Sequence, residues 1–422
     1  MIEKLPSCDD PFDRLLPVTE ARKRLFAALT SIVDRESLAL SNCLGRVLAE
    51  DVVSPINVPS LPNSAMDGYA INANDIPDEG ELTLTLVGTA WAGKPYVDEV
   101  TSGSAVRIFT GAIMPAGADT VVIQEHVTAT DKQVTIAHDV QAGRNVRAAG
   151  EDVEKDEVVL MHGRQLTAAD IGVLASLGIA SVRVVRQLRV AFFTTGDELC
   201  SLDEFAGQEL PPGSLFDSNR YTLQALLTSM GVETIDLGVV PDNAADTRKA
   251  LETAAADADV VISSGGVSAG DADYVSKVFH ELGEVAFWKL AMRPGRPLAF
   301  GSIGKARFFG LPGNPVAVVV TFLEFVQPAI RYLSGMRDVE PVTLPATSLS
   351  KLRKTLGRTE FQRGIMRVSE DGEIVVESTG KQGAGRLSSV SRANCLIVID
   401  ADVETVMPGD RVGVQPFHGL LA

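Results

Sequence analysis

The sequence is poor in basic residues relative to acidic ones, and this limits what the molecule as a whole can bind. Its 422 residues include 38 Lys and Arg against 55 Asp and Glu, which gives a formal net charge of −17. Nucleic acids and anionic membranes bind surfaces with an excess of positive charge. The charge balance therefore argues against a protein that acts on nucleic acid or at a membrane surface.

Paired cysteines are also missing. No two of the four cysteines form a Cys-x-x-Cys pair; they are Cys8, Cys43, Cys200 and Cys395. A zinc site, an iron–sulfur cluster or a disulfide framework needs a different pattern, whereas scattered thiols fit a reducing compartment. We therefore predict a cytoplasmic protein whose free cysteines are simply buried.

The chain contains no recognisable secretory signal and no long apolar run. Its first ten residues lack a basic segment followed by apolar residues, which a signal peptide requires. Apolar stretches such as that around Val316–Leu323 are much shorter than the ~20 residues of a bilayer span. We expect a soluble protein, and neither low-complexity tracts nor internal repeats complicate this interpretation.

The chain does contain enough apolar sequence for several domains, with 45% apolar and 22% charged residues. At roughly 100–200 residues each, two to four domains are expected. Apolar residues at helical spacing predict a helix over Val18–Ile32, and three prolines predict a loop over residues 55–64. Short apolar runs between residues 70 and 140 predict a β-rich insertion, and a second helix is predicted over Thr167–Leu177 with Thr167 as its cap.

From residue 189 to about 335, apolar strands alternate with amphipathic helices. The predicted strands are Arg189–Thr195, Glu233–Val239, Asp259–Ser263, Val285–Leu290 and Arg307–Leu311. The predicted helices are Asn219–Met230, Ala244–Ala256, Tyr274–Leu282 and Pro315–Leu333. This alternation predicts a doubly wound, mainly parallel sheet with helices on both faces.

The whole chain is therefore predicted to be a multidomain α/β protein in which one domain is split around another. Short strands without helices after residue 337 predict a small C-terminal β-barrel or sandwich, of which we favour the barrel. The predicted domains are a split N-terminal domain at 1–55 and 140–186, a β-rich inserted domain at 56–139, the central α/β domain at 187–335 and the barrel at 336–422.

Acidic residues occur in three of the loops that follow these strands. Ligands of an open α/β sheet gather at the carboxyl ends of its strands, where the sequence places Asp197, Glu198, Asp242, Asp271 and Asp273. Each alone is more simply a turn or cap residue. As a set on one edge they would repel one another, and a bound cation would relieve this. Oxygen ligands without nearby His or Cys favour Mg²⁺ over zinc.

A glycine-rich loop and a group of cations follow two further strands. The loop Ser264-Gly265-Gly266-Val267-Ser268 precedes a predicted helix, so its amides could face an anion. It has neither a P-loop ending nor dinucleotide-fold spacing. Lys289, Arg293 and Arg296 follow one strand later, and they are either anion ligands or solvated surface cations. With a metal, this set describes a site for a di- or polyphosphate ester.

Eight short motifs are spread in order over nearly the whole chain. They are Ser64-Ala65-Met66-Asp67-Gly68-Tyr69-Ala70, Thr110-Gly111-Ala112, Gly150-Glu151-Asp152, Thr195-Gly196-Asp197-Glu198-Leu199, Ser264-Gly265-Gly266-Val267-Ser268 with Asp271-Ala272-Asp273-Tyr274, Lys289-Leu290-Ala291-Met292-Arg293-Pro294-Gly295-Arg296-Pro297, Leu311-Pro312-Gly313-Asn314-Pro315 and Phe361-Gln362-Arg363-Gly364. Taken singly, several are ordinary turns. Together they resemble the molybdopterin molybdenumtransferase family, which includes MoeA and the E domain of gephyrin.

The resemblance implies a homodimeric, Mg²⁺-dependent enzyme of molybdenum cofactor biosynthesis that inserts molybdate into adenylylated molybdopterin and releases AMP. It implies catalytic roles for Asp67, Thr110, Asp152, Glu198, Asp242, Asp273, Lys289 and Arg293, with Asp242, Asp273 and Glu198 as metal ligands. It implies substrate binding by Arg147, Gly265, Gly266, Ser268, Arg296, Pro312, Asn314, Arg363 and Ser388. Expected protein partners are a molybdopterin adenylyltransferase and the molybdoenzymes or carriers that receive the cofactor.

Two features depart from the family pattern or extend it. Arg293 and Arg296 stand where lysine is usual, and a planar guanidinium binds an oxyanion differently from an ammonium group. Residues 351–368 carry six cations, Arg363 among them. This basic segment either meets molybdate or a pterin phosphate, with hydroxyls such as that of Ser388 nearby, or forms a solvated strand face.

Three alternatives remain open from the sequence. Gephyrin's E domain also binds receptor peptides, so the same fold can serve as a scaffold. A nucleotide pyrophosphatase can be built on the central α/β domain, although such relatives lack the segments that carry Asp67 and Thr110. A tungsten-handling enzyme would use the same residues, because tungstate and molybdate have nearly the same size and charge.

Overall fold

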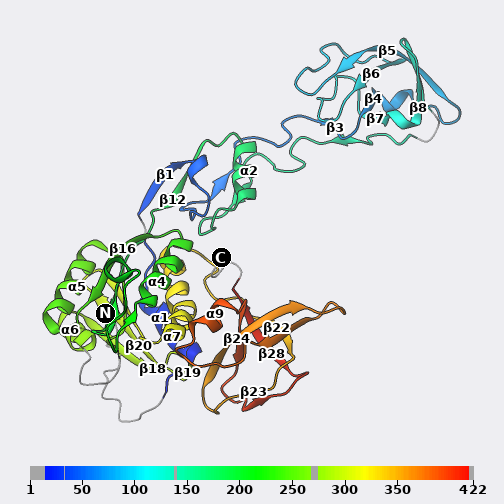
Figure 1. The fold of residues 1–422 in the computed structure, drawn as a ribbon. Helices are drawn as coiled ribbons and strands as arrows, with labels where there is room; N and C mark the ends of the chain where they lie inside the picture. The colour runs from blue at the N-terminus through cyan, green and yellow to red at the C-terminus, as the bar shows by residue number, and fades with distance from the viewer. Residues whose placement is uncertain (1–14, 33, 137–139, 268–273, 418–422) are drawn as a thin grey trace. The chain divides into compact units, whose positions relative to one another are not determined.

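The computed structural model describes residues 15–32, 34–136, 140–267 and 274–417. The chain divides into two compact units, each visible in Figure 1. Unit 1 comprises Met1–Glu36, Gly45–Val47 and Val184–Ala422, and unit 2 comprises Ser37–Leu44 and Leu48–Arg183. The finer division into four domains stays a prediction.

The centre of unit 1 is a six-stranded sheet with the order β16-β13-β17-β21-β20-β18. Its strands are β13 (Arg189–Thr195), β16 (Glu233–Val240), β17 (Val260–Ser264), β18 (Glu284–Lys289), β20 (Pro297–Ile303) and β21 (Ala306–Leu311). The first four strands of the order pair in parallel, and β20 is antiparallel to both of its neighbours. The predicted mainly parallel sheet is confirmed. Strand β20 was missed, because it forms a hairpin with β21 and no helix separates them.

Helices cover both faces of this sheet because its strands are apolar on both faces. They are α1 (Val18–Ala28), α4 (Ser218–Ser229), α5 (Ala244–Asp257), α6 (Tyr274–Leu282), α7 (Pro315–Thr321) and α8 (Gln327–Leu333). Val190 and Phe192 of β13 belong to the core that contains α1, α4, α7 and α8. Ala191 and Phe193 belong to the core that contains α5 and α6. Figure 1 shows α5 and α6 on the side of the sheet away from α4 and α7.

Residues Pro315–Leu333 form one continuous helical stretch, with a π-helical turn at Phe322–Val326 between α7 and α8. Among the described residues this is the one helix long and apolar enough to cross a membrane by length and composition, and 89% of its most apolar window is buried. The π-helical turn carries Glu324, which is buried and pairs with Arg22 of α1. Burial raises the pKa of Glu324 to about 7.

The C-terminal part of unit 1 is a closed five-stranded barrel, as predicted. Its strands are β22 (Leu344–Ser348), β24 (Thr359–Val368), β25 (Ile374–Ser378), β26 (Cys395–Ile399) and β28 (Arg411–Pro416). The order β24-β25-β22-β28-β26 closes through pairing of β24 with β26. Strand β19 (Met292–Arg293) adds to β24. Smaller elements of unit 1 are β14 (Leu199–Cys200), α3 (Leu202–Phe205), β15 (Leu215–Phe216), β23 (Leu352–Arg353), β27 (Thr405–Val406) and α9 (Leu387–Ser391).

Unit 2 contains a six-stranded sheet with the order β7-β4-β6-β5-β9-β8. Its strands are β4 (Gly68–Ile71), β5 (Leu82–Ala90), β6 (Ser104–Ile108), β7 (Thr120–Ile123), β8 (Val127–Ala129) and β9 (Gln133–Ile136). Alternate residues of these strands pack into two separate apolar cores, as expected for a β-sheet buried on both faces. The predicted β-rich insertion is confirmed.

The remaining elements of unit 2 and of the chain segments that enter and leave it are short. They are β1 (Arg35–Ala39), β2 (Val52–Val53), β3 (Asn63–Ser64), β10 (Val146–Arg147), β11 (Val158–Leu160), β12 (Ser181–Val185), the helix α2 (Ala168–Ser176) and three 3₁₀ turns at Leu40–Asn42, Ala73–Asp75 and Gln124–His126. Thr167 and Asp170 form the predicted capping box of α2. Buried cysteines are confirmed for Cys43, Cys200 and Cys395, and Cys8 lies outside the described residues.

Candidate active site

The loops predicted to carry the site lie at one edge of the unit 1 sheet. The register aligns Thr194 with Ser264 and Ser264 with Leu311, so β13, β17 and β21 end together. Strand β18 runs in the same direction as β21, because β20 is antiparallel to both. The segments that follow these strands therefore emerge at the same edge.

Three carboxylates cluster at the β13–β16 end of this edge. The amide of Asp242 donates a hydrogen bond of 3.1 Å to Asp197 Oδ1. Partial burial raises the pKa of Asp242, and the negative charges of Asp197 and Glu198 raise it further. Such mutual repulsion is relieved when a cation is bound. The oxygen-only donors fit Mg²⁺ by their chemistry.

The metal site as predicted cannot be assembled from the described residues alone. Among them, no group of three His, Cys, Asp or Glu side chains is arranged to hold a metal ion. Asp273, the third predicted ligand, and Asp271 lie outside the described residues, as does the predicted substrate-binding residue Ser268. Glu198 and Asp242 are therefore the two predicted ligands that the structure places at this edge.

The glycine-rich loop after β17 makes contacts that only glycine permits. Gly265 has a φ of +96°, and a Cβ atom there would lie 2.7 Å from the Thr195 carbonyl oxygen. At Gly266 a Cβ atom would lie 2.5 Å from Val275 Cγ2. The Gly265 amide donates to the Leu311 carbonyl oxygen over 3.1 Å, so it is used within the fold. These glycines allow close backbone approach between the ends of three strands.

Asn219, in the first turn of α4, ties two of these loops together. Its Nδ2 donates to Ser264 Oγ at 3.0 Å and to the Gly313 carbonyl oxygen at 2.7 Å. Ser264 Oγ in turn donates to the Pro312 carbonyl oxygen at 3.3 Å. Pro312 is buried and Asn314 is exposed. Sequence reasoning did not single out Asn219; its only signal was its place after Asp217 at the start of a predicted helix.

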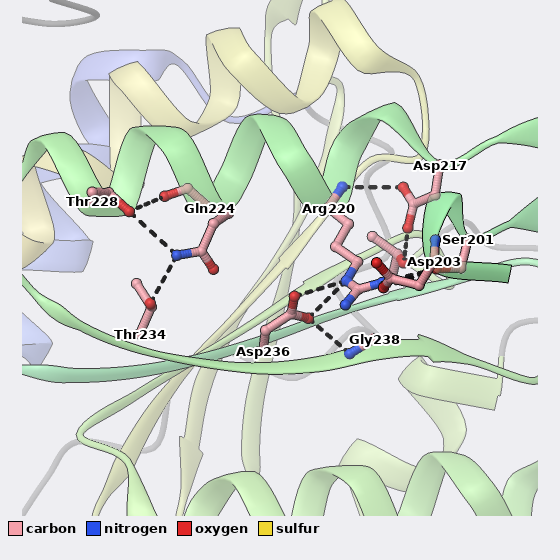
Figure 2. A network of polar contacts seen from close by, with 10 residues as sticks. Ser201, Asp203, Asp217, Arg220, Gln224, Thr228, Thr234, Asp236 and Gly238 are labelled. Carbon is pink, nitrogen blue, oxygen red and sulfur yellow. Dashed lines mark hydrogen bonds and ion pairs between the residues drawn. The ribbon is translucent and has the colours of Figure 1, made fainter. Parts of the chain in front are cut away.

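A second network of hydrogen bonds holds Ser201 and Asp203, which follow Glu198 in the sequence (Figure 2). Arg220 Nε donates to both carboxylate oxygens of Asp236, at 3.0 and 2.7 Å. Its Nη1 donates to Ser201 Oγ and to Asp203 Oδ2, each at 3.1 Å. One guanidinium thus connects α4 to β16 and to the start of α3. One N–H thus contacts both oxygens of Asp236, and the planar guanidinium fixes the relative orientation of all these contacts.

The predicted cations lie toward the opposite end of the same edge. Lys289 ends β18, and Lys289, Arg293 and Arg296 are exposed. Because β16 and β18 are the outer strands of a six-stranded sheet, five spacings of ~4.8 Å separate their ends by roughly 24 Å. Arg293 Nε lies 4.0 Å from Glu360 Oε1 of the barrel. The structure therefore does not bring these cations into contact with the three carboxylates.

Arg363 is buried on the outer face of β24, where α9 covers it, and not on a solvated strand face. Its Nε donates to Ser389 Oγ at 3.1 Å, and its Nη1 donates to the Phe361 carbonyl oxygen at 3.4 Å. Burial lowers the pKa of Arg363 to about 10. The neighbouring predicted residue Ser388 is exposed.

Unit 2 brings two of its predicted residues into direct contact. The Thr110 amide and the Thr110 hydroxyl both donate to Asp67 Oδ1, each over 2.8 Å. These hydrogen bonds and the charge of Arg107 hold the pKa of Asp67 below its usual value. Arg147 and Asp152 are exposed on other segments of unit 2.

A cavity of about 250 Å³ lies away from all of these groups. It is at the amino-terminal ends of the parallel strands, where Asp259 and Arg307 line it together with Arg186. Arg186 donates two hydrogen bonds of 2.7 Å to Asp259. Because ligands of such sheets bind at the carboxyl ends, this cavity is not the candidate site.

Comparison with known proteins decides the family. The MoeA N-terminal region (domain I and II) matches residues 16–178, a probable molybdopterin binding domain matches residues 191–332, and the MoeA C-terminal region (domain IV) matches residues 345–417. A molybdopterin molybdenumtransferase of Haemophilus influenzae is 44% identical over 409 residues, covering 96% of this chain and 100% of the relative. The chain belongs to the molybdopterin molybdenumtransferase family.

Other members of the molybdopterin molybdenumtransferase family agree with this assignment. A Nostoc molybdopterin molybdenumtransferase is 37% identical over 425 residues and covers 97% of each chain. The crystal structure of a molybdopterin biosynthesis MoeA protein from Pyrococcus horikoshii matches with a TM-score of 0.83 at 31% identity, covering 96% of this chain and 100% of that one. The chain is accordingly an enzyme of molybdenum cofactor biosynthesis.

Proposed function

We propose that this enzyme inserts molybdate into adenylylated molybdopterin and releases AMP in a Mg²⁺-dependent reaction. The observation that carries the proposal is the group of Asp197, Glu198 and Asp242 beside the glycine-rich loop. Burial, together with the negative charges of Asp197 and Glu198, raises the pKa of Asp242, so its ionised form carries an electrostatic cost. A cation bound with a phosphoanhydride would remove that cost.

The roles proposed for the described residues follow from where each of them lies, and the role of Asp273 is proposed from the family resemblance alone. Glu198 and Asp242 would hold Mg²⁺ together with Asp273, and the bound ion would neutralise phosphate charge during anhydride cleavage. Gly265 and Gly266 are proposed to bind the substrate through their loop, whose shape depends on their close packing against Thr195 and Val275. Lys289, Arg293 and Arg296 would bind anionic groups of the substrate or molybdate at the other end of the edge.

The separation of the carboxylates from the cations favours an elongated substrate. The strand order places Asp242 roughly 24 Å from Lys289 and Glu198 about three strand spacings, roughly 14 Å, from Arg296, and one small oxyanion bridges neither distance. A pterin joined through two phosphates to adenosine is a long molecule with charge in its middle. This separation therefore supports an adenylylated pterin better than free molybdopterin.

We further propose that the enzyme acts in the cytoplasm as a homodimer and that Asp67, Thr110, Arg147 and Asp152 serve the same reaction from the partner subunit. Asp67 stays negatively charged because Thr110 donates two hydrogen bonds to it. Arg363, Asn314, Pro312 and Ser388 are proposed to contribute to substrate binding. A molybdopterin adenylyltransferase would supply the substrate, and molybdoenzymes or carriers would receive the product.

The test is AMP release by the purified full chain from adenylylated molybdopterin and molybdate, with and without Mg²⁺. We expect Asp242→Asn to lower the rate at least about 100-fold. Asp257→Asn is the matched control, since Asp257 is exposed at the end of α5, and it should keep the rate within about twofold. Equal rates for both variants, or full activity in the absence of divalent cations, would refute the proposed site.

A further inference from the structure

Three strands of unit 2 end side by side, next to the Asp67–Thr110 pair. The register places Ile108 opposite both Gly68 and Ala90. The next row across the sheet therefore contains Asp67, which precedes β4, together with Phe109 and Trp91, which follow β6 and β5. Neighbouring strands are about 4.8 Å apart, so this row spans roughly 10 Å.

Side chains on this face form a continuous stack. The rings of Trp91 and Phe109 are parallel within 10°, with their centroids 4.0 Å apart. The guanidinium of Arg107 lies 5.0 Å from the Phe109 centroid and 4.8 Å from the Tyr69 centroid. Arg107 is further held by a hydrogen bond to Gln124. Aromatic and cation–π contacts of this kind stabilise each ring in one orientation.

Trp91 is the outermost member of the stack, and one face of its ring is open. Phe109 covers one face, yet 50% of the Trp91 surface is exposed. The backbone is fixed by two hydrogen bonds of 3.0 Å between Trp91 and Lys94 across a tight turn. That turn approaches the Thr110 segment, since a Cβ atom at Gly111 would lie 3.9 Å from Ala92 Cβ. The exposed indole of Trp91 is thus held parallel to the Phe109 ring, close to Thr110, which is proposed to act on the substrate.

We propose that the open face of Trp91 is a binding platform on which a flat heteroaromatic ring of the substrate stacks. This inference rests on the proposed function, in which the substrate carries two such rings, a pterin and an adenine. Both rings carry N–H donors at their edges, and Asp67 in the same row offers a carboxylate acceptor. A preformed aromatic surface loses little conformational freedom when a ring binds to it.

A purely structural role for Trp91 makes a different prediction. If Trp91 only braced Phe109, its loss would displace Thr110 and impair the chemical step. A stacking role predicts weaker substrate binding with the chemical step preserved, because neither the pterin nor the adenine ring of the substrate contains the phosphoanhydride bond that breaks. The two roles are separated by measuring KM and kcat independently.

The experiment uses the full chain with Trp91→Leu, Trp91→Phe and the control Val97→Ala, since Val97 is 88% exposed in the same unit. We expect Trp91→Leu to raise the KM for adenylylated molybdopterin roughly tenfold, the loss typical of removing one stacked ring. Its kcat and its KM for molybdate should stay within about twofold. Trp91→Phe should fall between Trp91→Leu and the unsubstituted enzyme. A KM for Trp91→Leu equal to that of Val97→Ala, or a fall in kcat alone, would overturn the proposal.

Equilibrium dialysis with AMP and with 6-methylpterin identifies the ring and does not require turnover. Weaker binding of AMP alone to Trp91→Leu assigns the platform to adenine, and weaker binding of 6-methylpterin alone assigns it to the pterin. Unchanged binding of both probes, or no binding of either to the unsubstituted chain at millimolar concentration, overturns the proposal. If the unsubstituted chain releases no AMP, the proposed function fails, while dialysis still decides whether Trp91 binds a ring.

Discussion

Asn219 donates a hydrogen bond of 2.7 Å to the carbonyl oxygen of Gly313, and this bond joins the first turn of α4 to the loop after β21. The same Nδ2 donates to Ser264 at the end of β17. Two loops of the candidate site are therefore held by one buried side chain that itself contributes no charge. The spacing of the loops after β17 and β21 therefore depends on the Asn219 amide, which has no role in the proposed reaction itself.

Replacing this amide should loosen both loops. Asn219→Leu leaves the Gly313 carbonyl and the Ser264 hydroxyl without their donor, which costs about 1–3 kcal/mol in unfolding free energy. Urea denaturation measures the loss, and AMP release should fall in parallel. The control is Gln224→Leu on the same helix, whose amide contacts Thr234 near the start of β16. If Gln224→Leu impaired AMP release as much as Asn219→Leu, the loops would not depend on Asn219.

The glycine-rich loop should reject even a methyl group. Gly265→Ala would place Cβ 2.7 Å from the Thr195 carbonyl oxygen at a φ of +96°, so both backbone strain and a clash oppose it. Gly213→Ala isolates the strain, because Gly213 has a φ of +89° with nothing within 4 Å of a Cβ atom. We expect Gly213→Ala to cost about 1–2 kcal/mol and to keep activity. Gly265→Ala should cost clearly more and abolish AMP release; similar melting temperatures for the two variants would count against the close contact.

Arg220 should not tolerate replacement by lysine. Arg220→Lys keeps the charge but cannot contact both Asp236 oxygens while also reaching Ser201 and Asp203. We expect a loss of about 1–2 kcal/mol and faster proteolysis between residues 199 and 217. Arg189→Lys is the matched control, since its pair with Glu233 is exposed and should be worth less than about 0.5 kcal/mol. Equal effects of the two substitutions would show that the planar geometry of the Arg220 guanidinium is unimportant.

Glu324 should make the stability of unit 1 depend on pH. Burial raises its pKa from 4.5 to about 7, so the folded state binds a proton that the unfolded state releases above pH 4.5. The unfolding free energy should therefore fall as the pH rises from about 4.5 to 7, by on the order of 3 kcal/mol. Glu324→Gln removes this titration.

The unfolding free energies of the unsubstituted chain and of Glu324→Gln are each measured by urea denaturation at pH 5 and pH 8. The difference between the two pH values should be smaller in Glu324→Gln than in the unsubstituted chain. Arg22 keeps its hydrogen bond of 2.9 Å to the main-chain oxygen of residue 324 in both proteins. Identical pH profiles would mean that Glu324 stays ionised through its pairing with Arg22.

Much of the fold could be predicted because local patterns and tertiary packing agree. Alternation of strands and helices gave the mainly parallel sheet, and Thr167 with Asp170 gave the start of α2. Helix α1 ends at Ala28, before the predicted Ile32, because apolar spacing continues after the backbone becomes extended. Strand β20 follows the loop containing Arg293 and Arg296 directly, and its pairing with β21 has no helical spacer to signal it.

The candidate site was less accessible to sequence reasoning. Local sequence patterns do not determine the order of strands in a sheet, so the distance between Asp242 and Lys289 along the edge of the unit 1 sheet could not be predicted. Arg363 looked like one of six cations on a basic segment, and only the packing of α9 against β24 shows that it is buried. The contact between Asp67 and Thr110 joins residues 43 positions apart, and spacing alone gave no reason to pair them.

The helical stretch Pro315–Leu333 has a consequence for how the chain matures. Its covering side chains come from both extremities of unit 1, including Leu25 of α1 and Phe361, Leu396 and Phe417 of the barrel region. When a ribosome has completed this stretch, the last of these residues have not yet been made. A nascent chain therefore exposes the apolar surface of this stretch until residues 334–417 have been added, and such transient exposure favours aggregation.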